Sequence, residues 1–141
     1  MRLLGLDVGD KTIGLAASDE LGYTAQGLPT VRRQQEQRDL DAVFAVVKER
    51  GTERAVVGWP LNMDGSEGPR ARLCRAFATK LVARGLETRL WDERLTSRAA
   101  ERALIEGGAR REKRRQVIDQ LAAQLILQGY MDAGCPEGEL P

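Results

Sequence analysis

Short apolar runs separated by turn residues make up the first part of the chain. Residues 2–8 and 12–18 are two such runs, and only Gly9-Asp10-Lys11 separates them. Apolar runs joined by so short a loop are typical of a β-hairpin. Residues 23–32 form a third run after a second short turn. The pattern therefore predicts three antiparallel strands at the start of the chain.

The middle of the chain alternates between helical and extended patterns. Two segments repeat apolar residues at helical spacing, and each ends at a glycine suited to the C-terminus of a helix. Their positions are Leu40, Val43, Phe44 and Val47 before Gly51, and Leu73, Phe77, Leu81 and Val82 before Gly85. Residues 55–58 and 87–91 read as strands after these helices, and the first is apolar throughout, as in a buried parallel strand. We therefore expect two strand-helix crossovers after the hairpins.

The last third of the chain predicts helices and a tail. We expect one helix at about 96–106, a charged connector from Ala109 to Arg115, and a final helix at about 115–132. The apolar face of the final helix is expected to be Ile118, Leu121, Ala122, Leu125 and Ile126. Residues 133–141 contain two prolines and predict a flexible tail. The order of elements indicates a single α/β domain over residues 1–141, with a five-stranded mixed sheet and helices on both faces.

Composition narrows the chemistry that this chain can perform. It has 141 residues, a formal net charge of +1 and no histidine, so a histidine base and histidine-ligated zinc or iron are excluded. Its cysteines, Cys74 and Cys135, show neither metal-type spacing nor a disulfide framework, which favours a reducing compartment. No signal peptide is evident, and no apolar run reaches the roughly 18 residues of a membrane span. We therefore expect a soluble, cytoplasmic protein in which carboxylates carry any catalysis.

Three acidic residues stand where an open α/β sheet brings side chains together. Asp7 lies near the end of the first strand, Glu93 follows the fifth, and Asp119 lies in the first half of the last helix. Ligands of such sheets bind at the carboxyl ends of the strands, and a helix packed over that rim would bring Asp119 to the other two. Three carboxylates suit a pair of Mg²⁺ or Mn²⁺ ions roughly 3.5–4 Å apart, which activate a water and stabilise the leaving 3′ oxygen of a phosphodiester.

Each acid also has a purely structural explanation when it is viewed alone. Asp7 would accept backbone hydrogen bonds in the hairpin turn. Glu93, between Asp92 and Arg94, would belong to a surface ion pair. Asp119 would interact favourably with the dipole at the N-terminus of its helix. The three acids together, in a histidine-free chain with this order of elements, favour a metal site.

A basic segment precedes the helix that carries Asp119. Its candidate substrate-binding cations are Arg110, Arg111, Lys113, Arg114 and Arg115. Charged runs of this kind are usually solvated loops, but one beside a site that cleaves phosphodiesters can also bind neighbouring phosphates. Lys11, in the first turn beside Asp7, has the same two interpretations, and both stay open for it and for the segment.

Four segments in series resemble the YqgF family, whose bacterial members are described as pre-16S rRNA nucleases and as RuvX-type Holliday junction resolvase homologues. The segments are Gly5-Leu6-Asp7-Val8-Gly9 with Ile13-Gly14-Leu15-Ala16, Val57-Gly58-Trp59-Pro60 with Met63-Asp64-Gly65-Ser66, Asp92-Glu93-Arg94-Leu95-Thr96, and Asp119-Gln120-Leu121-Ala122-Ala123-Gln124-Leu125-Ile126-Leu127-Gln128. The resemblance covers nearly the whole chain, up to Asp132. It implies a ribonuclease-H-like fold with strand order 3-2-1-4-5, and it implies that Asp7, Glu93 and Asp119 are the catalytic carboxylates.

One position departs from the wider superfamily to which this family belongs. Related junction resolvases carry a glutamate at the end of the fourth strand. Here that place reads Gly58-Trp59-Pro60 and offers no acid. If the resemblance holds, Glu93 after the fifth strand must supply the missing carboxylate.

The sequence is best interpreted as a metal-dependent nuclease acting on structured nucleic acid. The resemblance implies a role in precursor 16S rRNA 5′-end processing, in Holliday junction resolution, or in both. Symmetric cutting of a junction would require a homodimer. Two other functions stay open: a non-catalytic nucleic-acid-binding scaffold, and a small ATP-dependent phosphotransferase. The phosphotransferase fold also begins with an Asp-x-Gly hairpin, but it needs two such domains, and this chain supplies one.

Overall fold

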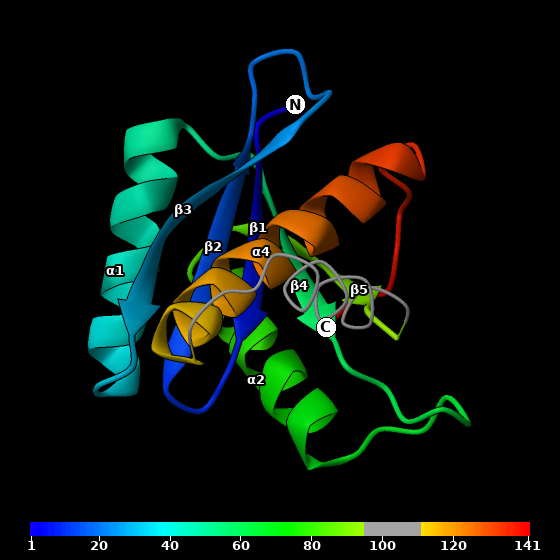
Figure 1. Cartoon of the computed structure of the whole chain (residues 1–141). Coiled ribbons are helices and arrows are strands. Elements are labelled where there is room, and N and C mark those ends of the chain that lie inside the picture. Colours follow the sequence, from blue (N-terminus) through cyan, green and yellow to red (C-terminus); the bar gives the residue numbers. More distant parts are fainter. Residues whose placement is uncertain (95–110) are drawn as a thin grey trace.

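The computed structural model describes residues 1–94 and 111–141, with side chains for residues 1–94 and 120–141 (Figure 1). Its elements are β1 (Leu3–Val8), β2 (Thr12–Ser18), β3 (Ala25–Arg32), α1 (Glu36–Arg50), β4 (Arg54–Trp59), α2 (Pro69–Ala83), β5 (Glu87–Asp92) and α4 (Arg111–Asp132). The strands form one five-stranded sheet in the order β3-β2-β1-β4-β5. The first three strands are antiparallel, and β4 and β5 run parallel to β1. The mixed sheet and its order are therefore confirmed, whereas the helix expected at about 96–106 lies outside the described residues.

Helices cover both faces of the sheet. α1 and α2 pack on one face and α4 crosses the other (Figure 1). Side chains alternate along a strand, so Leu4 and Leu6 of β1 point toward α1 and α2, whereas Leu3 points toward α4. The strands are thus buried on both sides, as the apolar run at residues 55–58 requires.

α4 begins at Arg111, earlier than the start at about 115 expected from the sequence. The difference has a simple cause, since arginine, lysine and glutamate are good helix formers and no glycine or proline interrupts this charged stretch. Much of the expected connector is therefore the first turn of the helix. Asp119 becomes the ninth residue of α4. It lies beyond the first turn, so the N-terminal dipole of the helix does not account for it.

The face that α4 presents to the sheet differs from the predicted one. Its buried residues are Ala123, Ile126, Leu127, Tyr130 and Met131, whereas Leu121, Ala122 and Leu125 are only half-buried. Ile126 is therefore confirmed as part of the buried face, and the side chain of Ile118 lies outside the described ones. The prediction was wrong for Leu121, Ala122 and Leu125, because apolar residues occur on several sides of this part of the helix and the pattern alone did not fix its rotation about its axis.

Small residues in the sheet allow α4 to pack closely against it. Gly5, Ala16 and Gly27 are paired neighbours on β1, β2 and β3. A Cβ atom built on Gly5 would lie 2.7 Å from the Cβ of Leu127 and 3.0 Å from the carbonyl oxygen of Ala123. Such a contact is too close for any side chain, so the glycine allows α4 to lie directly on the sheet.

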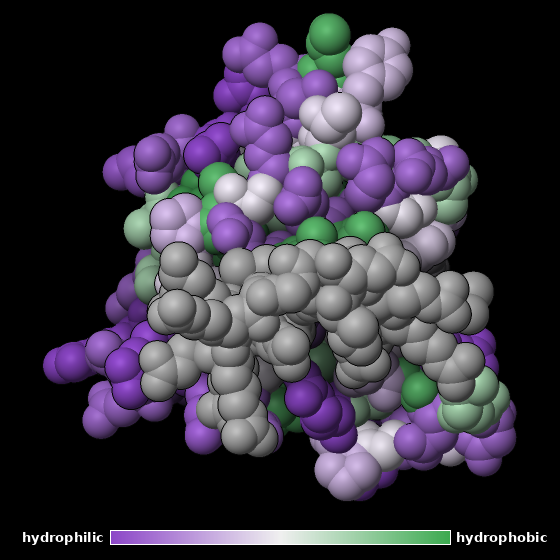
Figure 2. Space-filling model, viewed as in Figure 1, coloured by the Kyte–Doolittle hydropathy of each residue, from purple (hydrophilic) through white to green (hydrophobic). Residues whose placement is uncertain are grey.

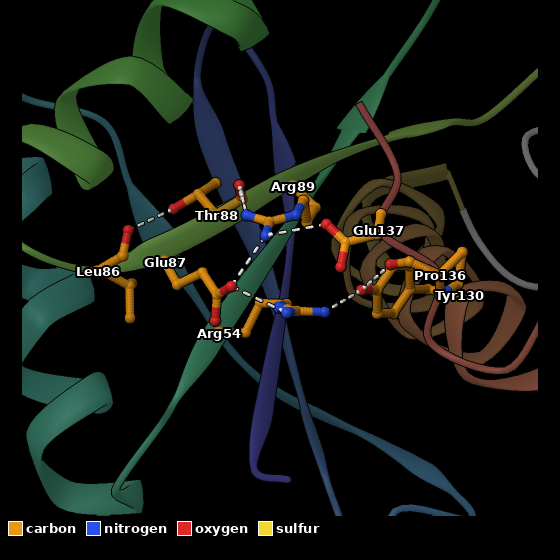
Figure 3. A network of polar contacts seen from close by, with 8 residues as sticks. All are labelled: Arg54, Leu86, Glu87, Thr88, Arg89, Tyr130, Pro136 and Glu137. Carbon is orange, nitrogen blue, oxygen red and sulfur yellow. Dashed lines mark hydrogen bonds and ion pairs between the residues drawn. The ribbon is translucent and has the colours of Figure 1, made fainter. Parts of the chain in front are cut away.

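The C-terminal segment is attached to β5, although its composition predicted a flexible tail (Figure 3). Leu90 and Glu139 form an antiparallel bridge, with a 2.7 Å hydrogen bond from the Leu90 amide to the Glu139 carbonyl. Tyr130 donates its hydroxyl proton to the Pro136 carbonyl at 2.6 Å, and Arg54 donates to the Tyr130 oxygen at 2.8 Å. These contacts place the segment against the edge strand β5 at Pro136 and Glu139.

The side of the molecule that carries α4 is mixed in polarity. Outside the grey residues, Figure 2 shows hydrophilic side chains interspersed with isolated hydrophobic ones. Among the side chains that the structure describes, Leu21 and Tyr23, in the β2–β3 turn, and Met63 are the most exposed large apolar ones. In the part of the chain that the structure describes, no helix is long and apolar enough to cross a membrane.

Candidate active site at the carboxyl ends of the parallel strands

Asp7 and Glu93 lie at the same rim of the sheet. Asp7 is the penultimate residue of β1, and Glu93 directly follows the last residue of β5. Both strands run parallel to β4, which lies between them. Their carboxyl ends therefore share one edge, where open α/β sheets bind ligands.

Both carboxylates also belong to the face that α4 covers. Asp7 alternates with Gly5, which contacts α4, so the two residues share one side of β1. Glu93 reaches the same side, because its carboxylate lies beside Ile126 of α4 at the end of β4. The sheet therefore brings the two acids together on one face of one rim.

Gly58 makes room for the Glu93 carboxylate. A Cβ atom built on Gly58 would lie 2.1 Å from Glu93 Oε2 and 2.5 Å from Ile126 Cδ1. The paired register of β1 and β4 ends with Leu6 opposite Val57, so Asp7 and Gly58 are the next residues on the two strands. The acid that directly follows β5 thus occupies the space at the end of β4.

Glu93 is buried, and its environment disfavours the charged form. Glu93 is only 7% exposed, and its Oε2 atom has no hydrogen-bond partner among the described residues. Burial, and then the negative charge of Asp7, raise the pKa of Glu93 to about 7, against the opposing effect of Arg70. The surface ion pair considered for Glu93 is made instead by its neighbours, since Arg94 binds Asp92 at 2.6 Å.

α2 packs its first turns against the end of β1. The Cys74 thiol lies 3.5 Å from the Val8 carbonyl oxygen, to which it donates. Burial, with the charges of Glu93 and Asp7 in support, raises the pKa of Cys74 to about 12. The thiol is therefore neutral near pH 7 and is no nucleophile.

The position of Asp119 follows from the backbone of α4. Positions 119, 123, 126 and 130 fall on one side of an α-helix, and the last three are buried against the sheet. Residue 119 is therefore on the sheet-facing side of α4, one turn before Ala123, which contacts Gly5 of β1. The Asp119 side chain lies outside the described ones. Among the side chains that are described, no group of three or more potential ligands surrounds a metal position.

The candidate substrate-binding cations are only partly described. Lys11 is exposed in the β1–β2 turn, two residues after Gly9. Arg110 lies outside the described residues, and the backbone of α4 carries Arg111, Lys113, Arg114 and Arg115. The structure therefore places Lys11 in the turn after the Asp7 end of β1 and the backbone of the other four at the start of α4.

Sequence reasoning missed one charged residue at this rim, Arg70. It is the second residue of α2, which follows β4 through the 60–68 loop. The signal was present in Gly68-Pro69, because proline favours the first position of a helix. A helix that starts after a parallel strand begins at the same edge as the carboxyl end of that strand.

The fold defines the class of protein. A mixed sheet in the order 3-2-1-4-5 with helices on both faces is the ribonuclease-H-like fold, and solved structures share it. Thermus thermophilus RuvC in complex with Holliday junction substrate superposes with a TM-score of 0.60 at 18% identity, covering 99% of this chain and 98% of that one. The fowlpox virus resolvase in complex with Holliday junction DNA gives a TM-score of 0.56 at 10% identity, covering 96% of this chain and all of that one.

Sequence comparison then identifies the family. The sequence profile of RuvX, described as Holliday junction resolvase, matches residues 1–133. Proteins named "Putative pre-16S rRNA nuclease" from Myxococcus xanthus and Moorella thermoacetica are 55% and 56% identical to this chain over 137 and 133 residues. These alignments cover 96% and 94% of this chain and 91% and 95% of the relatives. The chain belongs to the RuvX family.

Proposed function

We propose that this protein is a metal-dependent nuclease that hydrolyses phosphodiester bonds in structured nucleic acid. The observation that carries the proposal is the paired position of Asp7 and Glu93, with a buried Glu93 oxygen that has no hydrogen-bond partner among the described residues. A buried carboxylate beside a second one is costly unless a proton or a cation compensates it.

The residues at this rim fit a divalent cation. The donors are carboxylate oxygens, which suit Mg²⁺ and Mn²⁺, and the orphaned Oε2 atom of Glu93 is available as a ligand atom. We propose that Asp7 from β1, Glu93 from β5 and Asp119 from α4 hold the ions. Bound ions of this kind supply Lewis-acid chemistry, activating the attacking water and stabilising the charge on the leaving oxygen.

The protein side chains then have positional and electrostatic tasks. Asp7 and Glu93 are fixed by the ends of two parallel strands, so their separation does not depend on a loop. The Glu93 carboxylate lies beside Gly58 and Ile126, and its Oε2 atom is buried. No histidine takes part, since the chain has none. Proton transfer therefore falls to water and carboxylates.

The substrate class follows from the relatives and from the chain's cations. Close relatives are named for pre-16S rRNA, and the structural neighbours were solved with Holliday junction DNA. We propose precursor 16S rRNA 5′-end processing, junction resolution, or both. In this proposal Lys11 and the basic residues 110–115 bind phosphates next to the cleaved bond, which positions the substrate without reading its sequence.

A parallel cleavage assay tests the proposal and separates the substrates. The protein is incubated with a labelled precursor 16S rRNA leader, a four-way DNA junction and a linear duplex of the same sequence, each with Mg²⁺, Mn²⁺ or EDTA. We expect cleavage of the leader or the junction with metal and none in EDTA. Binding of every substrate without cleavage of any would support the non-catalytic scaffold instead.

Junction resolution would also require a second active site. Two symmetric cuts need two copies related by a twofold axis, so we expect a homodimer if the junction is cleaved by paired incisions. Light scattering of the protein with bound junction measures the assembly. A mass of one protein per junction would count against paired incision and would favour processing of precursor rRNA.

A further inference from the structure

Arg70 stands at the rim of the Asp7–Glu93 site as an exposed cation. A Cβ atom built on Gly9, two residues after Asp7, would lie 3.9 Å from Nη2 of Arg70. The guanidinium also acts on Glu93, whose pKa it lowers against the effects of burial and Asp7. Arg70 thus lies beside Gly9, at the rim that carries the two carboxylates, and it is exposed to solvent.

Within residues 1–94, four other arginines near this end of the sheet are already engaged. Arg33 pairs with Asp39 at 3.2 Å, Arg75 with Glu67 at 2.7 Å and Arg94 with Asp92 at 2.6 Å. Arg72, two residues further along the same helix, donates to the Glu67 carbonyl at 3.0 Å. Within residues 1–94 and 120–141, Arg70 has no such hydrogen-bond or ion-pair partner. Its guanidinium therefore keeps its donors for a ligand.

The chemistry of the site indicates which ligand that is. A phosphodiester approaching two carboxylates meets repulsion that cations must offset. A guanidinium presents paired donors that match two oxygens of a phosphate. We propose that Arg70 binds the non-bridging oxygens of a substrate phosphate beside the Asp7–Glu93 site. This proposal rests on the proposed nuclease function, because it supplies that site with a substrate contact.

A binding experiment on modified junctions tests this contact. Four-way DNA junctions are prepared with one neutral methylphosphonate at a time, at each phosphate within three positions of the branch point. The affinities of wild-type protein, Arg70→Gln and the matched control Arg72→Gln are measured in Ca²⁺. We expect Arg70→Gln to weaken binding of the unmodified junction about tenfold or more, and Arg72→Gln to leave it nearly unchanged.

The methylphosphonate series identifies the contact itself. At the phosphate that Arg70 binds, the modification removes the charged oxygen, so Arg70→Gln should cause no further loss there. At every other phosphate, the factor by which the methylphosphonate weakens binding and the factor by which Arg70→Gln weakens binding should multiply. Equal affinities for Arg70→Gln and Arg72→Gln would overturn the proposal, and so would a loss that persists undiminished at every modified position. Absence of cleavage by the wild type would refute the nuclease function, whereas these affinities decide the role of Arg70 separately.

Discussion

The carboxylate of Glu93 occupies the volume that a side chain at Gly58 would fill. A Cβ atom at Gly58 would lie 2.1 Å from Glu93 Oε2, a distance at which one of the two groups must move. The glycine at the end of β4 and the acid after β5 therefore form one unit, in which the absence of one side chain permits the position of the other. The carboxylate of Glu93 therefore lies at the rim of the sheet where β1 carries Asp7.

Replacing Gly58 by alanine should disrupt the site. The new methyl group displaces Glu93 and Ile126, and overpacking of this kind costs about 1–3 kcal/mol of stability. Cleavage should fall together with stability, because Glu93 loses its position. Urea unfolding and single-turnover cleavage of the same sample measure both effects.

A second substitution separates this clash from a general loss of packing. In a Glu93→Ala background the carboxylate is absent, so Gly58→Ala should cost clearly less stability than in the wild-type background. Equal costs in both backgrounds would show that Glu93 and Gly58 do not share this space.

The raised pKa of Glu93 predicts a pH dependence of stability in the metal-free protein. Below pH 4.5, the ordinary value, Glu93 is protonated in the folded and the unfolded chain. As pH rises from 4.5 to about 7, the unfolded chain loses this proton while the folded one keeps it, so stability falls. The loss is complete above about pH 7 and amounts to about 3 kcal/mol.

The measurement is urea unfolding in EDTA between pH 4.5 and 8, with Glu93→Gln as the matched neutral variant. The stability of the wild type should decline relative to this variant over that window, because other carboxylates contribute to both proteins alike. Mn²⁺ should remove much of the decline, since a cation stabilises the ionised form. Parallel curves for the two proteins would contradict the buried, proton-binding Glu93.

The basic residues before and within the start of α4 should contribute to phosphate binding without sequence preference. Replacing Arg110, Arg111, Arg114 and Arg115 by glutamine should weaken binding to all sequences about equally. The slope of log affinity against log salt concentration should become shallower by about 0.9 for each phosphate of duplex DNA that the variant no longer neutralises. Glutamine at Arg38 and Lys48 of α1, which covers the opposite face of the sheet, is the control. An unchanged slope would assign the segment to the solvated surface.

The sequence predicted the sheet well because its strands are marked by apolar runs with short turns. It did not fix the rotation of α4 about its axis, since apolar residues occur on several sides of that helix and its close contact with Gly5 of the sheet leaves no mark on the apolar pattern. The attachment of Glu139 to Leu90 was also missed, because a single backbone bridge leaves no pattern of apolar residues.

Part of the candidate site could likewise be predicted from the sequence, and part could not. Asp7 and Glu93 could be identified as residues that share a rim, because strand ends can be read from the sequence. The burial of Glu93 over Gly58 could not, since it depends on the register between β4 and β5. Arg70 was missed because its significance arises from its distance to Gly9, a residue far away in the sequence.

The most direct test of the metal-dependent site is cleavage by three isosteric variants, Asp7→Asn, Glu93→Gln and Asp119→Asn. Each keeps the shape of its side chain but removes one charged ligand. Wild-type protein should cleave the precursor rRNA leader or the four-way junction in Mg²⁺ and Mn²⁺ and should be inactive in EDTA. Each variant should fold, bind the substrate in Ca²⁺ and cleave more than about a hundredfold more slowly, since even residues behind metal ligands contribute about 10–100-fold. Cleavage near the wild-type rate by any one variant, or full activity in EDTA, would contradict a site in which these three carboxylates hold the ions.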